Sequence, residues 1–102
     1  MKTEQMITQF TEYCKVFRNL SPETQRAYAS DLHQFESFCK QLNHSIFSSD
    51  AIKEWLKVLD SKLKPRSILR KCTSLKSFYR FARISGWIDS APFSSAKHIQ
   101  RI

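Results

Sequence analysis

The fold is decided by residues 21–43, which read SPETQRAYASDLHQFESFCKQLN. Ser21 is placed to cap a helix, because its hydroxyl can accept a hydrogen bond from a backbone N–H of the first turn. Pro22 fits the first helical position, where no backbone donor is needed, and Glu23 puts a negative charge at the positive end of the helix dipole. Residues suited to a core then recur every three or four positions, namely Thr24, Tyr28, Leu32, Phe35, Phe38, Cys39 and Leu42. The pattern predicts an amphipathic helix from Pro22 to about Asn43.

The same spacing predicts two shorter helices on either side of this stretch. One runs from about Thr3 to Arg18, and the other is capped within residues 48–50 and ends near residues 60–62. The residues expected to face inward are Met6, Ile7, Phe10, Tyr13, Cys14 and Phe17 in the first, and Ile52, Trp55, Leu56 and Leu59 in the second. Each helix therefore has one apolar side that a neighbour must cover.

A long helix is predicted from Pro65 to Ser85, and Gly86 can adopt the left-handed conformation that ends it. Its inward stripe consists of Ile68, Cys72, Leu75, Phe78, Tyr79 and Ala82, and its polar side of Arg66, Arg70, Thr73, Ser77 and Arg80. Phe81 and Ile84 interrupt the polar side near the end, so we expect another element to cover both.

Composition restricts the fold class further. The chain has 102 residues, of which 41% are hydrophobic, which suits one packed domain better than two. One glycine and three prolines argue against an all-β fold, which needs many turn residues. A run of about 18 apolar residues and the apolar segment of a secretory leader are both missing, so we expect a cytoplasmic protein that does not cross a membrane. The sequence predicts an all-α fold, a compact bundle of four to five helices, with a weak helix after Phe93.

Cysteine and histidine do not form a metal-binding pattern. The candidates are Cys14, Cys39, Cys72, His33, His44 and His98. No two of them have the spacing of a metal knuckle, and all three cysteines fall on inward stripes. We expect reduced, buried thiols and neither a metal ion nor another cofactor.

Charge is distributed unevenly along the chain. The 17 Lys and Arg against 9 Asp and Glu give a formal net charge of +8. Asp89 is the single acid beyond residue 60, and residues 61–88 contain basic residues but no acid. Like charges on neighbouring turns, such as Arg66 and Arg70, cost about 0.2–0.5 kcal/mol per pair. A polyanionic partner would offset that cost.

Short hydroxyl side chains lie between these charges, at Thr73, Ser74 and Ser77. They let a helix approach a surface closely and donate to phosphates or base edges, and an α-helix fits the major groove of duplex DNA. RNA and membranes suit the residues less well, because most aromatic residues lie on core stripes and no apolar margin flanks the basic side. A rival function is a helical protein-interaction module whose basic side binds an acidic partner. A helix-turn-helix regulator is a third candidate, although the helix after Pro65 is long for a recognition helix.

Three stretches of the chain follow one known pattern in order and spacing. The first consists of Ser21, Thr24, Ala27, Tyr28, Asp31, Leu32, Phe35 and Phe38; the second of Ser67, Ile68 and residues 73–79; the third of Gly86, Trp87, Ile88, Ala91 and Pro92. Together they resemble the "S..T..AY..DL..F..F", "TI...LSALR.FY" and "G.I..NP" patterns of the tyrosine recombinases, the family of phage integrases and Xer-like proteins. Ser67 stands where that family usually has Thr, and Ala91 where it usually has Asn.

The resemblance implies the N-terminal, SAM-like core-binding domain of such a recombinase in residues 1–92, with residues 93–102 beginning a linker. In that family the second and fourth helices present polar faces to the major groove. The residues that this assigns to DNA binding are Thr24, Gln25, Arg26, Arg66, Arg70, Thr73, Ser74 and Ser77, with Lys64, Lys71 and Lys76 as peripheral phosphate contacts. The implied partners are double-stranded DNA, the protein's own C-terminal catalytic domain, and neighbouring recombinase protomers that meet the first helix on DNA.

The resemblance also implies that catalysis resides elsewhere. The tyrosine nucleophile of the family and its Arg, Lys and His helpers belong to the C-terminal domain of a full-length enzyme that cleaves and rejoins DNA. Tyr13, Tyr28 and Tyr79 lie on core stripes, which favours packed rings over nucleophiles. His33 lies on the outer side of its helix and is expected to be an ordinary surface residue. We therefore expect no catalytic residue in this chain.

Overall fold

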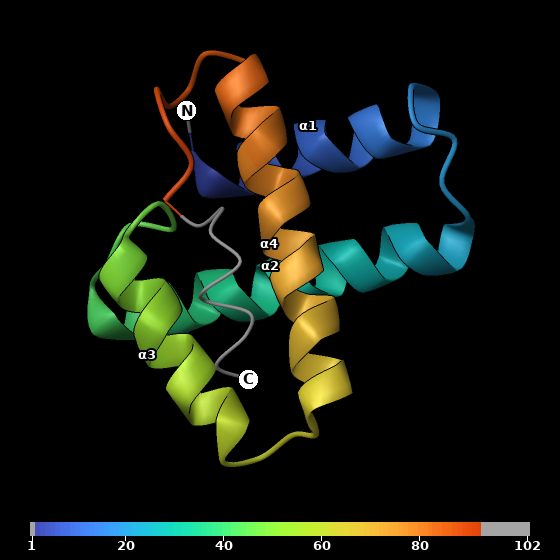
Figure 1. Ribbon diagram of the computed structural model, residues 1–102. Helices are drawn as coiled ribbons and strands as arrows, with labels where there is room; N and C mark the ends of the chain where they lie inside the picture. The colour runs from blue at the N-terminus through green and yellow to red at the C-terminus, as the bar shows by residue number, and fades with distance from the viewer. Residues whose placement is uncertain (1, 93–102) are drawn as a thin grey trace.

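The computed structural model describes residues 2–92, which form four α-helices joined by short connections (Figure 1). These are α1 (Thr3–Val16), α2 (Pro22–Leu42), α3 (Ser49–Asp60) and α4 (Pro65–Ile84). The prediction of an all-α fold is confirmed. The helix predicted after Phe93 and the linker predicted for residues 93–102 lie outside the described residues. None of the helices in the described part combines the length and the apolar character needed to cross a bilayer.

The ends of the helices follow from the residues that cap them. The Ser21 hydroxyl accepts a hydrogen bond from the backbone N–H of Thr24 at 3.2 Å, and the Ser48 hydroxyl accepts one from the first turn of α3 at 3.2 Å. Asn43, which caps the C-terminus of α2, has a φ of 58°, and Gly86, just after α4, has a φ of 80°. A left-handed residue does not continue an α-helix, so both helices end close to the predicted positions.

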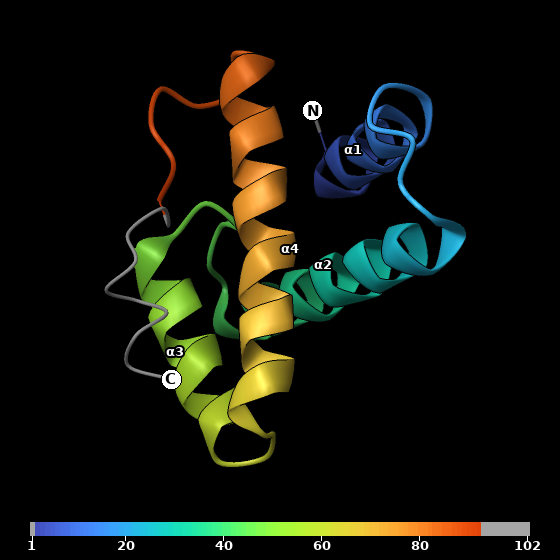
Figure 2. The ribbon, with the colours of Figure 1, turned by 45° about the vertical axis from the view of Figure 1, so that its right-hand side comes forward.

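α4 stands across α1 and α2, and α3 runs beside it (Figure 2). The core forms where these helices meet, and Phe10, Phe35, Phe78 and Tyr79 are among its largest fully buried side chains. The rings of Phe10 and Phe78 meet edge to face with their centroids 5.6 Å apart, which joins α1 to α4. The Tyr79 hydroxyl donates to the carbonyl of Ile46 at 2.5 Å, so α4 also holds the connection between α2 and α3.

Three residues predicted to be covered lie at the surface instead. Phe17 is 78% exposed, Ile84 69% and Leu42 42%. Leu42 and Ile84 are the last residues of their helices, and Phe17 follows the last residue of α1, so all three lie at helix ends. Phe81 is partly covered as predicted, with the ring centroid of Trp87 5.3 Å from its own.

All three cysteines are free and buried, as the sequence predicted. Burial raises the pKa of the Cys39 and Cys72 thiols to about 11, and it also raises the pKa of Cys14. The thiols are therefore protonated at neutral pH and act as small apolar groups of the core.

Candidate nucleic-acid interface

The outer side of α4 displays most of the residues predicted to contact DNA. The exposed or half-exposed members of the predicted set on this helix are Arg66, Arg70, Thr73, Lys76 and Ser77, with Lys64 at its N-terminal cap. They recur at intervals of three and four, so they share a stripe that is turned away from the core. α4 therefore presents cations and hydroxyl groups to solvent over most of its length.

Two of the predicted contacts, Lys71 and Ser74, point into the bundle instead. Only 6% of Lys71 and 0% of Ser74 is exposed. Ser74 Oγ donates to Oδ2 of Asp31 at 2.6 Å, and Lys71 Nζ donates to Oδ1 of Asp31 at 2.9 Å and to Oε1 of Gln34 at 2.8 Å. The prediction that these two side chains face a ligand is wrong, because both are engaged inside the contact between α2 and α4. Lys71 and Ser74 are therefore not part of the candidate interface.

Asp31, which the sequence placed in the family pattern without assigning it a role, is the acceptor at the centre of these bonds. It is fully buried, and Oδ1 also accepts from Nη2 of Arg70 at 3.1 Å, while 49% of the Arg70 side chain stays exposed. One carboxylate thus offsets part of the positive charge of Arg70 and Lys71 and holds the Arg70 guanidinium against α2. Asp31 lies three residues after Tyr28 and four before Phe35, on the edge of the inward stripe, and this position is the signal that could have revealed it.

The three residues predicted at the start of α2 differ in how free their side chains are. Thr24 Oγ1 accepts from the hydroxyl of Ser21 at 3.0 Å, within the helix cap. Gln25 is half-buried, and its Nε2 donates to the carbonyl of Leu20 at 2.8 Å. Arg26 is exposed and pairs with no carboxylate of the described residues. Of the three, Arg26 therefore retains the most capacity to bind a ligand.

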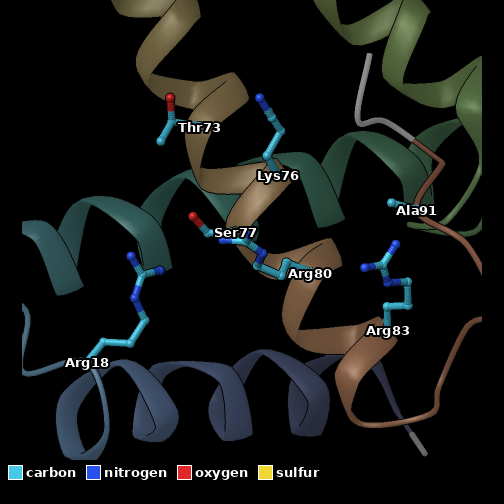
Figure 3. A pocket seen from close by; sticks show the side chains of 7 residues that line it. All are labelled: Arg18, Thr73, Lys76, Ser77, Arg80, Arg83 and Ala91. Carbon is cyan, nitrogen blue, oxygen red and sulfur yellow. The ribbon is translucent and has the colours of Figure 1, made fainter. Parts of the chain in front are cut away.

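A cleft of about 430 Å³ crosses the outer side of α4 in its C-terminal half (Figure 3). Its lining consists of Arg18, Thr73, Lys76, Ser77, Arg80, Arg83 and Ala91. Arg18, in the turn after α1, lies to one side of α4, and Arg83 and Ala91 lie to the other. The predicted set did not include Arg18, Arg80 or Arg83. Arg80 and Arg83 continue the basic pattern of α4 and could have been found from it, whereas no spacing in the sequence connects Arg18 with that helix.

The cations of this cleft differ from Arg70 and Lys71 in their electrostatic surroundings. Arg18, Lys76, Arg80 and Arg83 form no ion pair with a carboxylate of residues 2–92. Four positive charges, three from α4 and one from the turn after α1, thus face one cleft without a counter-charge from the described part of the chain. Such a surface suits an anion that offers several oxygen atoms.

The buried tyrosine has the surroundings of a structural residue. The Tyr79 hydroxyl is fully buried and bonded to a backbone carbonyl, and burial raises its pKa well above the ordinary value. Tyr13 and Tyr28 are half-buried beside other aromatic rings, with Tyr28 stacked 6.1 Å from Phe10. These tyrosines therefore contribute to packing between helices, as their stripes predicted.

Comparison with known proteins gives the class of this domain. The family model described as the phage integrase, N-terminal SAM-like domain matches residues 7–86. The chain belongs to this family, and the resemblance to the tyrosine recombinases is confirmed.

Individual relatives carry the name of tyrosine recombinase. The chain is 38% identical over 96 residues to tyrosine recombinase XerC of Chlorobaculum parvum. The matched region covers 83% of this chain and 28% of that protein. The chain is 32% identical over 94 residues to XerC of Oceanobacillus iheyensis (88% and 31% covered) and 32% identical over 91 residues to tyrosine recombinase XerD of Lacticaseibacillus casei (87% and 31%). The chain thus spans less than a third of the length of these relatives. No solved structure gives a significant match.

Proposed function

We propose that this chain is the duplex-DNA-binding N-terminal domain of a site-specific tyrosine recombinase, and that it docks the outer side of α4 and the start of α2 in the major groove. The observation that supports this most directly is the stripe of exposed cations and hydroxyls along α4. An α-helix with its side chains is about 10–12 Å across, close to the roughly 12 Å width of the major groove. The membership of the family and the names of its relatives are consistent with a role in recombination.

Individual side chains have different tasks in this proposal. Arg66 and Arg70 supply guanidinium groups that can form bidentate hydrogen bonds with base edges. Thr73 and Ser77 have short side chains, which let the backbone of α4 approach the floor of the groove. Lys64 and Lys76 contact phosphates at the margin, and Arg26 does so from α2. Thr24 and Gln25 position the first turn of α2 through their bonds to Ser21 and Leu20.

The proposal assigns cleavage and rejoining of DNA to a separate C-terminal domain, which residues 93–102 would join to this one. Neighbouring protomers assembled on the same DNA site are the further partners. A cytoplasmic location belongs to the same proposal, because three buried free thiols are typical of a reducing compartment.

Salt dependence of binding tests this function. In fluorescence-anisotropy titrations with a labelled duplex, the logarithm of the association constant should fall linearly with the logarithm of salt concentration, by about 0.9 for each phosphate neutralised. Arg66→Ala should weaken binding by about 1–3 kcal/mol, because it removes a contact of the groove-facing helix. The matched control is Lys53→Ala, which removes one exposed charge from α3 and should change the affinity little.

A negative result separates this function from its rival. Failure to bind any duplex at about 50 mM salt, together with saturable binding of an acidic peptide, would replace DNA by a protein partner. Equal losses for Arg66→Ala and Lys53→Ala would show that binding follows net charge and not the outer side of α4.

A further inference from the structure

We infer that the cleft across the C-terminal half of α4 is a binding site for backbone phosphates of DNA, with Arg18 on one side of the helix and Arg83 on the other contacting different phosphates. This inference rests on the proposed duplex binding and extends the contact from α4 to the end of α1. It assigns the cleft a sequence-independent anchoring role, distinct from base recognition by the N-terminal half of α4.

The placement of the two arginines is the first argument. Arg18 approaches the cleft from the turn after α1, and Arg83 lies in the last turn of α4, with Ser77 and Arg80 between them (Figure 3). A helix seated in the major groove nearly fills its width, so side chains that flank the helix on both sides meet the two sugar-phosphate walls. Arg18 and Arg83 are the flanking cations of this cleft.

The distribution of negative charge is the second argument. Asp31 lies within 3.1 Å of both Arg70 and Lys71, so their field is partly cancelled inside the protein. No carboxylate of the described residues pairs with Arg18 or Arg83. The positive potential is therefore partly cancelled beside Arg70 and Lys71 but not in the cleft, and a phosphate placed in the cleft gains more than one placed beside Arg70.

The chemistry of the lining selects phosphate over a base or a small apolar ligand. Guanidinium groups match the geometry of phosphate oxygens and bind them through two N–H donors. The Ser77 hydroxyl, half-buried in the cleft, has no hydrogen-bond partner among the described residues and is available as a further donor. Thr73 Oγ1 already donates to the carbonyl of Leu69 at 3.0 Å. No aromatic side chain of residues 2–92 lines the cleft, so this part of the chain offers a base no surface there on which to stack.

The test compares single and double variants of the full chain on a fluorescein-labelled duplex of mixed sequence. Arg18→Ala and Arg83→Ala should each weaken binding roughly three- to tenfold and reduce the slope of the salt dependence by about 0.9. The double variant should reduce the slope by about 1.8, because two phosphates are lost. Arg18→Lys should keep the slope, since a lysine still neutralises a phosphate. Lys15→Ala, one turn earlier on the exposed surface of α1 and outside the cleft, is the matched control and should leave the slope unchanged.

Each contrary result has a definite meaning. If Arg66→Ala weakens binding while Arg18→Ala and Arg83→Ala do not, the phosphate site is wrong and the proposed function stands. If the slope of the salt dependence falls by only about 0.9 in the double variant, as in each single variant, both arginines share one phosphate. That result contradicts the assignment to two sides of the helix. A wild-type chain that binds no duplex but is saturated by a polyglutamate peptide overturns both the inference and the proposed function.

Discussion

Replacing Asp31 by Asn should destabilise the domain although the two side chains have nearly the same shape. The buried carboxylate accepts hydrogen bonds from Ser74 Oγ, Lys71 Nζ and Arg70 Nη2. An amide at this position keeps one acceptor oxygen for Lys71 and Arg70, and its NH₂ group can donate to Ser74 Oγ if that hydroxyl turns its hydrogen to the carbonyl of Arg70. The negative charge that faces the two cations is lost. Lys71, with 8% of its side chain exposed, is left as a buried cation that faces only neutral amide oxygens, those of residue 31 and Gln34, and pairs with no carboxylate of the described residues.

The expected magnitude follows from the burial of the two partners. Removing one member of a buried ion pair costs about 3–5 kcal/mol, and the retained bond from Lys71 to Gln34 places the expected loss near the lower end, about 3 kcal/mol. The pair with Arg70 adds little, because a partly exposed ion pair contributes about 0–1 kcal/mol. For a domain of this length, a loss of about 3 kcal/mol lowers the melting temperature by roughly 12–24 °C.

Urea unfolding followed by circular dichroism measures this loss. Asp60→Asn makes the same chemical change at an exposed residue of α3 and should alter the free energy of unfolding by less than about 0.5 kcal/mol. Asp31→Asn combined with Lys71→Met removes the orphaned cation and should be more stable than Asp31→Asn alone. The reasoning is refuted if Asp31→Asn costs less than about 1 kcal/mol, or if the double variant is the less stable of the two.

Three further outcomes are expected from buried and exposed side chains. The free energy of unfolding should fall as the pH rises from about 9 toward 11, because burial raises the pKa of the Cys39 and Cys72 thiols from 9.0 to about 11. The expected fall is up to about 1.4 kcal/mol per pH unit for each thiol. Urea titrations across this range that show no decline would contradict the burial of the thiols. Tyr79→Phe should cost about 1–3 kcal/mol in the same assay, since it leaves a loop carbonyl without its donor, whereas Tyr28→Phe, which loses no hydrogen bond to a described residue, should cost less. Phe17→Ser should change the melting temperature by only a few degrees because the ring is 78% exposed, and a large loss would mean that Phe17 belongs to the core after all.

The helices could be predicted from the sequence because their signals are local. The cap at Ser21, the proline after it and the left-handed residues Asn43 and Gly86 act on backbone within one turn of themselves. The stripes placed residues such as Phe10 and Tyr79 correctly in the core, since a helix has one side to bury whatever its partner is.

The limits of the core depended on where each helix ends. The rule that buries Phe10 also assigned Phe17 to the core, and it failed because Phe17 follows the last residue of α1. The point at which two helices cross is set by side chains on both of them, so it cannot be predicted from the periodicity of one helix alone.

The sequence by itself determined that the chain is helical, that its thiols are buried and that positive charge concentrates in residues 61–88. The tertiary structure decided which of those charges face outward. Lys71 and Ser74 face inward because Asp31, 40 and 43 residues earlier in the chain, occupies the α2–α4 contact. Arg18 lines the α4 cleft because the turn after α1 lies beside it. Electrostatic energy depends on distance in space, and the folded packing of the helices sets that distance.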